Sequence, residues 1–144
     1  MAEVGEVERM ITKSGVPVVL HVAAEFEKLP VVRAVAETIA ILGDFTLDDV
    51  ADVKLAVDEV CSVLIAATRK GSELTCSFAS SEIALHITVS ASVDREGVPN
   101  QEGFGWHVLE TLMDFATVTV AVSGEEAAPE REVTVELIKR RGNI

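Results

Sequence analysis

The feature that most constrains the fold is a long amphipathic segment between Thr46 and Gly71. Thr46 can cap a helix, and Asp49 follows three residues later in the spacing of a capping box. Apolar side chains then recur at helical spacing, which predicts a long helix with one buried face, closed by Gly71. The apolar stripe consists of Leu47, Val50, Val53, Val57, Val60, Cys61, Leu64 and Ile65.

Alternating and β-branched residues predict strands on both sides of this helix. The order strand, helix, helix, strand, strand, helix, strand, strand predicts an α+β fold. We expect a two-layer sandwich, in which a mostly antiparallel sheet is covered on one face by helices. The expected strands are Val16–Ala23, Glu73–Phe78, Ile83–Val93, Thr117–Val122 and Glu132–Ile138, and the other expected helices are Pro30–Leu42, with Gly43 as a left-handed cap, and Gly105–Phe115.

Length and composition predict one domain. The chain has 144 residues, of which 49% are apolar, so it can fill one core. We expect the domain to span residues 16–141, after a mobile N-terminal arm at residues 1–15. The apolar runs are too short to cross a bilayer and the acidic start is unlike a signal peptide, which predicts a cytoplasmic protein with no membrane partner.

The charge of the chain disfavours nucleic acid as a direct partner. Its net charge is −12, and such a surface repels phosphates. The cluster Lys139, Arg140 and Arg141 is expected to be a solvated tail. No metal site is expected, because the three histidines are far apart and neither cysteine has a neighbour at ligand spacing. An acidic surface fits either solubility or attraction to a basic protein partner.

The segment from Lys54 to Val63 carries the first candidate chemistry. Lys54 and Asp58 are four residues apart and can pair on the helix surface. Glu59 borders the apolar stripe and could act as a general base if it is partly buried, the alternative being a solvated helix acid. Cys61 is expected to be a core residue, and a redox response of Cys61 or Cys76 stays open.

Two glycines before the predicted third helix form the second candidate. Gly103 and Gly105 permit close backbone approach and could offer N–H groups to a phosphate, although an ordinary loop-to-helix turn also uses glycine. Trp106, which follows them, is expected to pack into the core.

These two segments together resemble the RsbW-type anti-sigma factors, small members of the GHKL superfamily of ATPases. Residues 54–62 resemble the N-box helix of that family, and residues 103–114 resemble its second glycine box and the helix that follows. The resemblance covers residues 16–138, and the segments 62–65 and 105–109 are most similar to the actinobacterial, mycobacterial-type branch.

The resemblance implies a protein that sequesters an alternative sigma factor, usually as a homodimer. It also implies that a STAS-type anti-anti-sigma protein competes with the sigma factor for binding to this protein. Many members also phosphorylate a serine of that antagonist, using ATP and magnesium. Arg33 matches the family arginine that touches both protein partners, and Glu59 matches the catalytic glutamate. In such a kinase Gly103 and Gly105 would cradle phosphate.

Two departures from the family pattern concern the nucleotide. Val63 stands where family kinases have a magnesium-binding asparagine. Ala91 and Val93 stand where the first glycine box has its adenine-binding aspartate and a glycine, unless Asp94 and Gly97 are displaced equivalents. We therefore favour an anti-sigma factor with a weak or lost ATP site. The alternatives are an active serine-protein kinase and an interaction domain with another partner.

Overall fold

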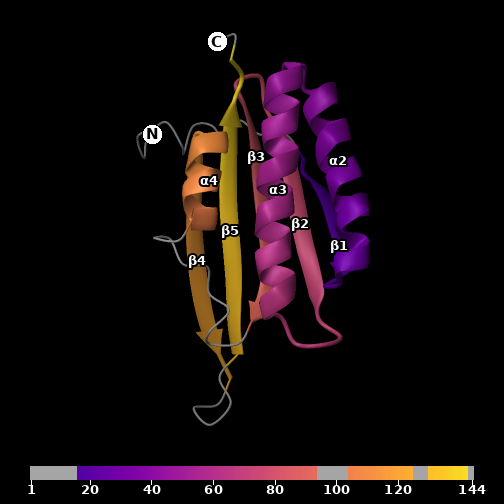
Figure 1. The fold of residues 1–144 in the computed structure, drawn as a ribbon, viewed down its shortest axis with the longest axis vertical. Coiled ribbons are helices and arrows are strands. Elements are labelled where there is room, and N and C mark those ends of the chain that lie inside the picture. Colours follow the sequence, from indigo (N-terminus) through magenta and orange to yellow (C-terminus); the bar gives the residue numbers. More distant parts are fainter. Residues whose placement is uncertain (1–15, 94–103, 125–129, 143–144) are drawn as a thin grey trace.

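Five strands form one antiparallel sheet in the order β1-β2-β3-β5-β4 (Figure 1). The computed structural model describes residues 16–93, 104–124 and 130–142. The predicted arm at residues 1–15, Asp94, Gly97 and Gly103 therefore lie outside the described residues. The strands are β1 (Val18–Ala23), β2 (Glu73–Ser80), β3 (Ala84–Val93), β4 (Phe115–Ser123) and β5 (Glu130–Arg140).

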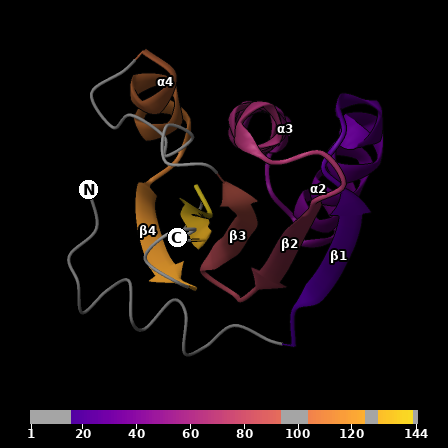
Figure 2. The same cartoon turned by 90° about the horizontal axis from the view of Figure 1, so that it is seen from below.

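The described helices lie on one face of this sheet, as the view along the strands shows (Figure 2). A short 3-10 helix, η1 (Phe26–Lys28), leads into α2 (Leu29–Leu42), which is followed by α3 (Leu47–Ala67) and α4 (Phe104–Leu112). This arrangement confirms the predicted α+β two-layer sandwich and its antiparallel sheet.

The alternation of side chains along β3 explains why the helices pack on that face. Leu85, Ile87 and Val89 are fully buried, whereas the intervening His86 and Thr88 are only partly covered. In register, Leu20 pairs with Cys76, Cys76 with Val89, Val89 with Val135 and Val135 with Val118, so one mostly apolar row crosses all five strands. The apolar stripe of α3 packs on this surface and forms the core.

Three predictions at the ends of helices are wrong. α4 ends at Leu112, whereas Phe115, its predicted last residue, begins β4. α3 ends at Ala67 instead of continuing to Gly71, because the next residue, Thr68, is extended and forms a bridge with Val93. After α2, Gly43 has an ordinary φ of −81°, and Asp44 is the residue in the left-handed region, with a φ of 59°. Asp tolerates this region better than most residues, so a local pattern does not distinguish the two positions.

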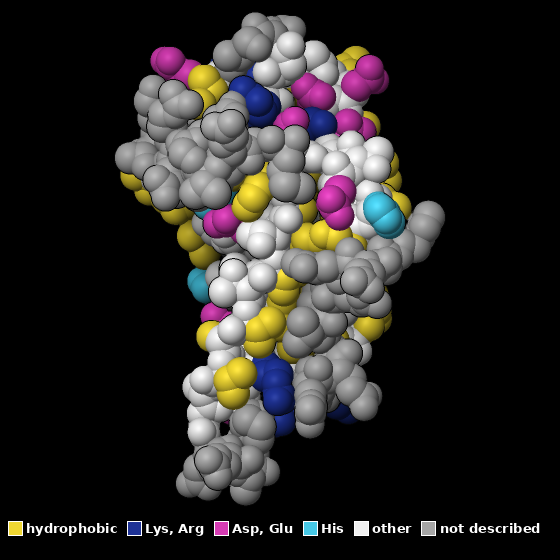
Figure 3. Space-filling model, turned by 90° about the vertical axis from the view of Figure 1, so that its left-hand side faces the viewer, with side chains coloured by type: hydrophobic (Ala, Val, Ile, Leu, Met, Phe, Trp, Pro, Cys, Tyr) yellow, Lys and Arg dark blue, Asp and Glu magenta, His cyan; other side chains and the backbone are white. Residues whose placement is uncertain are grey.

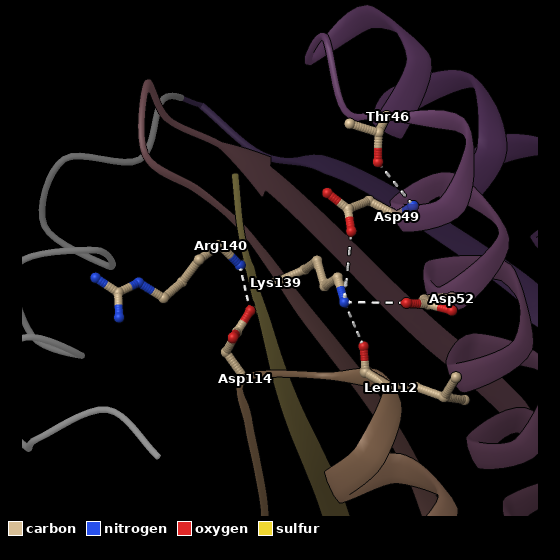
Figure 4. Close-up of polar contacts among 7 residues, drawn as sticks. All are labelled: Thr46, Asp49, Asp52, Leu112, Asp114, Lys139 and Arg140. Atoms are coloured by element: carbon tan, nitrogen blue, oxygen red, sulfur yellow. Dashed lines mark hydrogen bonds and ion pairs between the residues drawn. The ribbon is translucent and has the colours of Figure 1, made fainter. Parts of the chain in front are cut away.

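The predicted solvated tail is also wrong, because the basic residues at the end of β5 tie the layers together (Figure 4). The side chain of Lys139 is only 12% exposed. Its Nζ donates to Leu112 O at 2.6 Å and to Asp52 Oδ2 at 3.2 Å, and lies 3.7 Å from Asp49 Oδ1. Arg141 donates to the carbonyls of Gly43 and Glu82. The end of β5 is thereby attached to all three helices or their connections.

None of the described helices is both long enough and apolar enough to cross a membrane.

Candidate functional site

The outer surface of α2 and α3 carries two ion pairs that join the helices. Arg33 Nε lies 3.2 Å from Asp58 Oδ1. One turn further along, Lys54 pairs with Glu37. The predicted pair between Lys54 and Asp58 is therefore wrong: each side chain reaches across to α2, and a lysine four residues before an aspartate is the weaker orientation within a helix.

Glu59 and Gly105 are brought together although they are 46 positions apart in the chain. Glu59 is half-buried on α3, and Gly105 lies in the first turn of α4. A Cβ atom added at position 105 would lie 2.5 Å from Glu59 Oε1, so the glycine permits this close approach. A carboxylate near a helix N-terminus is favoured by the helix dipole. The contact could serve a nucleotide site or hold α4 against α3.

The neighbouring residues do not fit a magnesium-bound nucleotide. Val63, one turn beyond Glu59, is 37% exposed and has no oxygen to offer a metal. Ala91 and Val93 are each 4% exposed and belong to the same apolar cluster as Trp106, which is 6% exposed. A buried acceptor for an adenine amino group is therefore missing at position 91. The prediction that Trp106 packs into the core is confirmed.

Cys61 and Cys76 face each other between α3 and β2, and both are fully buried. The pKa of Cys61 is raised well above its usual value by its hydrogen bond to Cys76, then by burial and by the nearby charge of Asp58. The same hydrogen bond lowers the pKa of Cys76, while burial opposes the change. The prediction that Cys61 is a core residue is confirmed.

An apolar groove of about 650 Å³, which the sequence patterns did not predict, lies between β1 and α2. Val18, Val31 and Leu42 on its walls are 52%, 47% and 77% exposed. A signal was present, because α2 has only two charged side chains, Arg33 and Glu37, and both pair with α3. A helix that is apolar on its remaining surface has a second face to bury. The groove is lined by Val18, Pro30, Val31, Ala34, Val35, Thr38, Ile39 and Leu42.

The opposite edge of the sheet also exposes apolar side chains. Val120 and Val122 on β4 are 37% and 62% exposed. Figure 3 faces this side of the molecule and shows apolar side chains among polar and charged ones. Both edge strands, β1 and β4, therefore present apolar surface.

Comparison with known proteins shows which proteins this chain resembles in sequence. Two curated proteins, both named anti-sigma-F factor RsbW, come from Mycobacterium tuberculosis strains CDC 1551 / Oshkosh and ATCC 25618 / H37Rv. Each is 36% identical to this chain over 95 residues, which is 66% of the chain. The chain is similar in sequence to RsbW. The resemblance inferred from the two motif segments is thereby confirmed. The match covers 56% of the length of either RsbW protein, and no family model matches the chain.

A solved structure supports the fold. A chain in the crystal structure of the SiaB-SiaC complex from Pseudomonas aeruginosa superposes with a TM-score of 0.67, covering 96% of this chain and 99% of that one. The sequence identity is 6%, so this likeness concerns the architecture alone.

Proposed function

We propose that this protein binds and sequesters an alternative sigma factor, and that a STAS-type anti-anti-sigma protein releases it. The observation that carries the proposal is the 36% identity to anti-sigma-F factor RsbW over 95 residues. The acidic charge of −12 agrees with binding a protein and disfavours direct contact with nucleic acid.

Arg33 is the proposed contact for both protein partners. Its side chain is 45% exposed on α2, and exposed arginines are frequent among the residues that dominate binding energy. We expect Arg33→Ala to weaken sigma-factor binding by about 2 kcal/mol without unfolding the domain. Binding measured by calorimetry and folding measured by circular dichroism would separate the two effects. Unchanged affinity would remove Arg33 from the interface.

The proposal is tested by a tagged pull-down from the native host. Bound proteins are identified by mass spectrometry, and the elution is repeated with ATP and magnesium. Recovery of a sigma factor supports sequestration. Recovery of only a STAS protein or an unrelated protein contradicts it. A change in elution with ATP and magnesium would indicate a functional nucleotide site.

A serine-protein kinase is the second candidate function, and the contact between Glu59 and Gly105 is the observation that favours it. Val63 and Ala91 count against it, so we propose that nucleotide binding is weak or lost. The test is phosphate transfer from labelled ATP to a purified STAS partner by the wild-type protein and by Glu59→Ala. Transfer that disappears in the variant would establish the kinase, and absence of transfer by the wild type supports a binding regulator.

We also propose that the protein is a homodimer that buries the groove between β1 and α2. β1 is an edge strand, and edge strands beside apolar surface are common sites of pairing between identical chains. Val18, Val31 and Leu42 would lose their exposure in such a dimer.

A further inference from the structure

The ion pair between Arg33 and Asp58 leaves one oxygen of the carboxylate in an unusual state. The two side chains are 45% and 39% exposed, but Asp58 Oδ1 itself is buried. This oxygen accepts no hydrogen bond within the described residues, although it lies 3.2 Å from Arg33 Nε. The contact is therefore an attraction between charges and not an aligned hydrogen bond.

A buried carboxylate oxygen without a hydrogen bond is unfavourable for stability. Most buried polar atoms in proteins are satisfied, so each exception needs an explanation. The charge of Arg33 is what compensates Asp58 Oδ1 here. The contact that the structure gives to this buried oxygen is therefore the ion pair with Arg33.

The guanidinium of Arg33 keeps most of its donors available. Arginine has five N–H donors in a planar fork, and only the Nε edge faces Asp58. Neither terminal amino group of Arg33 forms a hydrogen bond to any described residue. These two groups can bind a carboxylate end-on through two parallel hydrogen bonds.

We propose that Asp58 is a positioning residue, which holds the Nε edge of Arg33 so that its two terminal amino groups face a carboxylate on the bound protein partner. This inference rests on the proposed function. Holding a long side chain before binding reduces the conformational entropy that is lost on association. Asp58 thereby raises the affinity for the partner without touching it.

The second ion pair on the same helices provides a matched control. Glu37 and Lys54 join α2 to α3 one turn away, with side chains 40% and 38% exposed, close to the exposure of Arg33 and Asp58. Lysine has no planar fork, so this pair is expected to connect the helices only. Loss of either pair removes one ion pair between α2 and α3, but only one loss frees Arg33.

The experiment measures the affinity of the sigma factor recovered in the pull-down for five purified proteins: the wild type, Asp58→Asn, Glu37→Gln, Arg33→Ala and the double variant Arg33→Ala/Asp58→Asn. We expect Asp58→Asn to bind about fivefold more weakly, the size of a surface ion-pair coupling, and Glu37→Gln to bind like the wild type. In the Arg33→Ala background, Asp58→Asn should cause no further loss. Equal losses in Asp58→Asn and Glu37→Gln, or an additive loss in the double variant, would overturn the inference.

A readout in the unbound protein separates this inference from the proposed function. The Nε–H signal of Arg33 in nitrogen-15 NMR should report an ordered side chain in the wild type and in Glu37→Gln, and a mobile one in Asp58→Asn. A signal that is equally mobile in all three proteins would overturn the positioning role. If the wild type binds no sigma factor, the proposed function fails and the partner-directed role of Asp58 fails with it, while the NMR comparison still shows whether Asp58 orders Arg33.

Discussion

Lys139 joins the end of β5 to two helices. Its ammonium group lies among Asp49, Asp52 and the carbonyl of Leu112, and so connects β5 to α3 and to the end of α4. The Lys139 side chain is only 12% exposed, so its ammonium group has lost most of its hydration, which the three acceptors replace. Its role is therefore structural, unlike that of a solvated tail residue.

We expect Lys139→Met to lower the free energy of unfolding by about 1–3 kcal/mol, because two acids and a carbonyl lose their shared cation. Urea denaturation followed by circular dichroism measures the change. Lys70→Met is the control, since Lys70 is exposed in the turn before β2 and should change stability by less than about 0.5 kcal/mol. Equal stability of the two variants would contradict the role of Lys139.

The two thiols allow a second prediction at the scale of residues. Because the pKa of Cys61 is raised, little thiolate forms there at neutral pH, and burial blocks access to Cys76 even though its pKa is lowered. We expect no reaction with Ellman's reagent at pH 7.5 in the native protein, and two reactive thiols in 6 M guanidinium chloride, an ordinary denaturing concentration. Rapid labelling of one thiol in the native protein would instead indicate a redox-accessible cysteine.

At the scale of elements, two adjacent residues lie in the turn between α2 and α3, Gly43 and Asp44. We expect substitutions of these residues to change stability in opposite directions. Asp44 has a φ of 59° and is 89% exposed, so its ion pair with Arg141 at 3.6 Å adds little stability. We expect Asp44→Gly to raise the free energy of unfolding by about 0.5–1 kcal/mol, because the strain of a left-handed non-glycine residue is relieved.

Gly43→Ala is the matched change next to it, and we expect the opposite sign. The added Cβ would lie 3.1 Å from the ring of Phe45 and 3.3 Å from the carbonyl of Ile39, so it is crowded despite an ordinary φ. Thermal unfolding of both variants tests the pair. A loss of stability in Asp44→Gly would contradict the assignment of backbone strain to Asp44.

What the sequence predicts about these elements depends on the range of the interactions. Repeating patterns identify α3 and β3, since burial at a period of 3.6 or 2 is a local property. The end of α3 depends on the bridge between Thr68 and Val93, and the place of Lys139 depends on acids 87 and 90 positions away. Such contacts follow from the packing of the layers and leave no mark in a short window of sequence.

The candidate site likewise has features that the sequence predicts and others that depend on the packing of the elements. The resemblance to a family places Glu59 and Gly105 in one expected nucleotide site, and the structure brings these two residues close together without testing that role. Spacing within α3 suggested that Asp58 would pair with Lys54, whereas the packing of two helices gives it Arg33. The small number of charged side chains on α2 indicates a second apolar face beside the groove. A search for one buried face per helix overlooks this signal.

On the scale of the whole molecule, the distribution of apolar surface is uneven. The helices bury one face of the sheet, yet α2 keeps apolar side chains on the side of β1, in a groove of about 650 Å³. A contiguous apolar surface of this kind on a monomer usually marks an interface. A chain with a net charge of −12 resists nonspecific association, so contact between two copies needs such an uncharged surface.

The proposed dimer leads to the last prediction. Val31→Glu places a charge in the groove, where pairing would have to bury it, and we expect the dimer dissociation constant to rise at least about tenfold. Light scattering coupled to size-exclusion chromatography, over a range of concentrations, measures this. Leu47→Glu is the control, because Leu47 is 86% exposed on α3 and does not line the groove, so that variant should associate like the wild type. A wild-type protein that stays monomeric at all concentrations, or equal dissociation in both variants, would show that two copies do not meet at the groove.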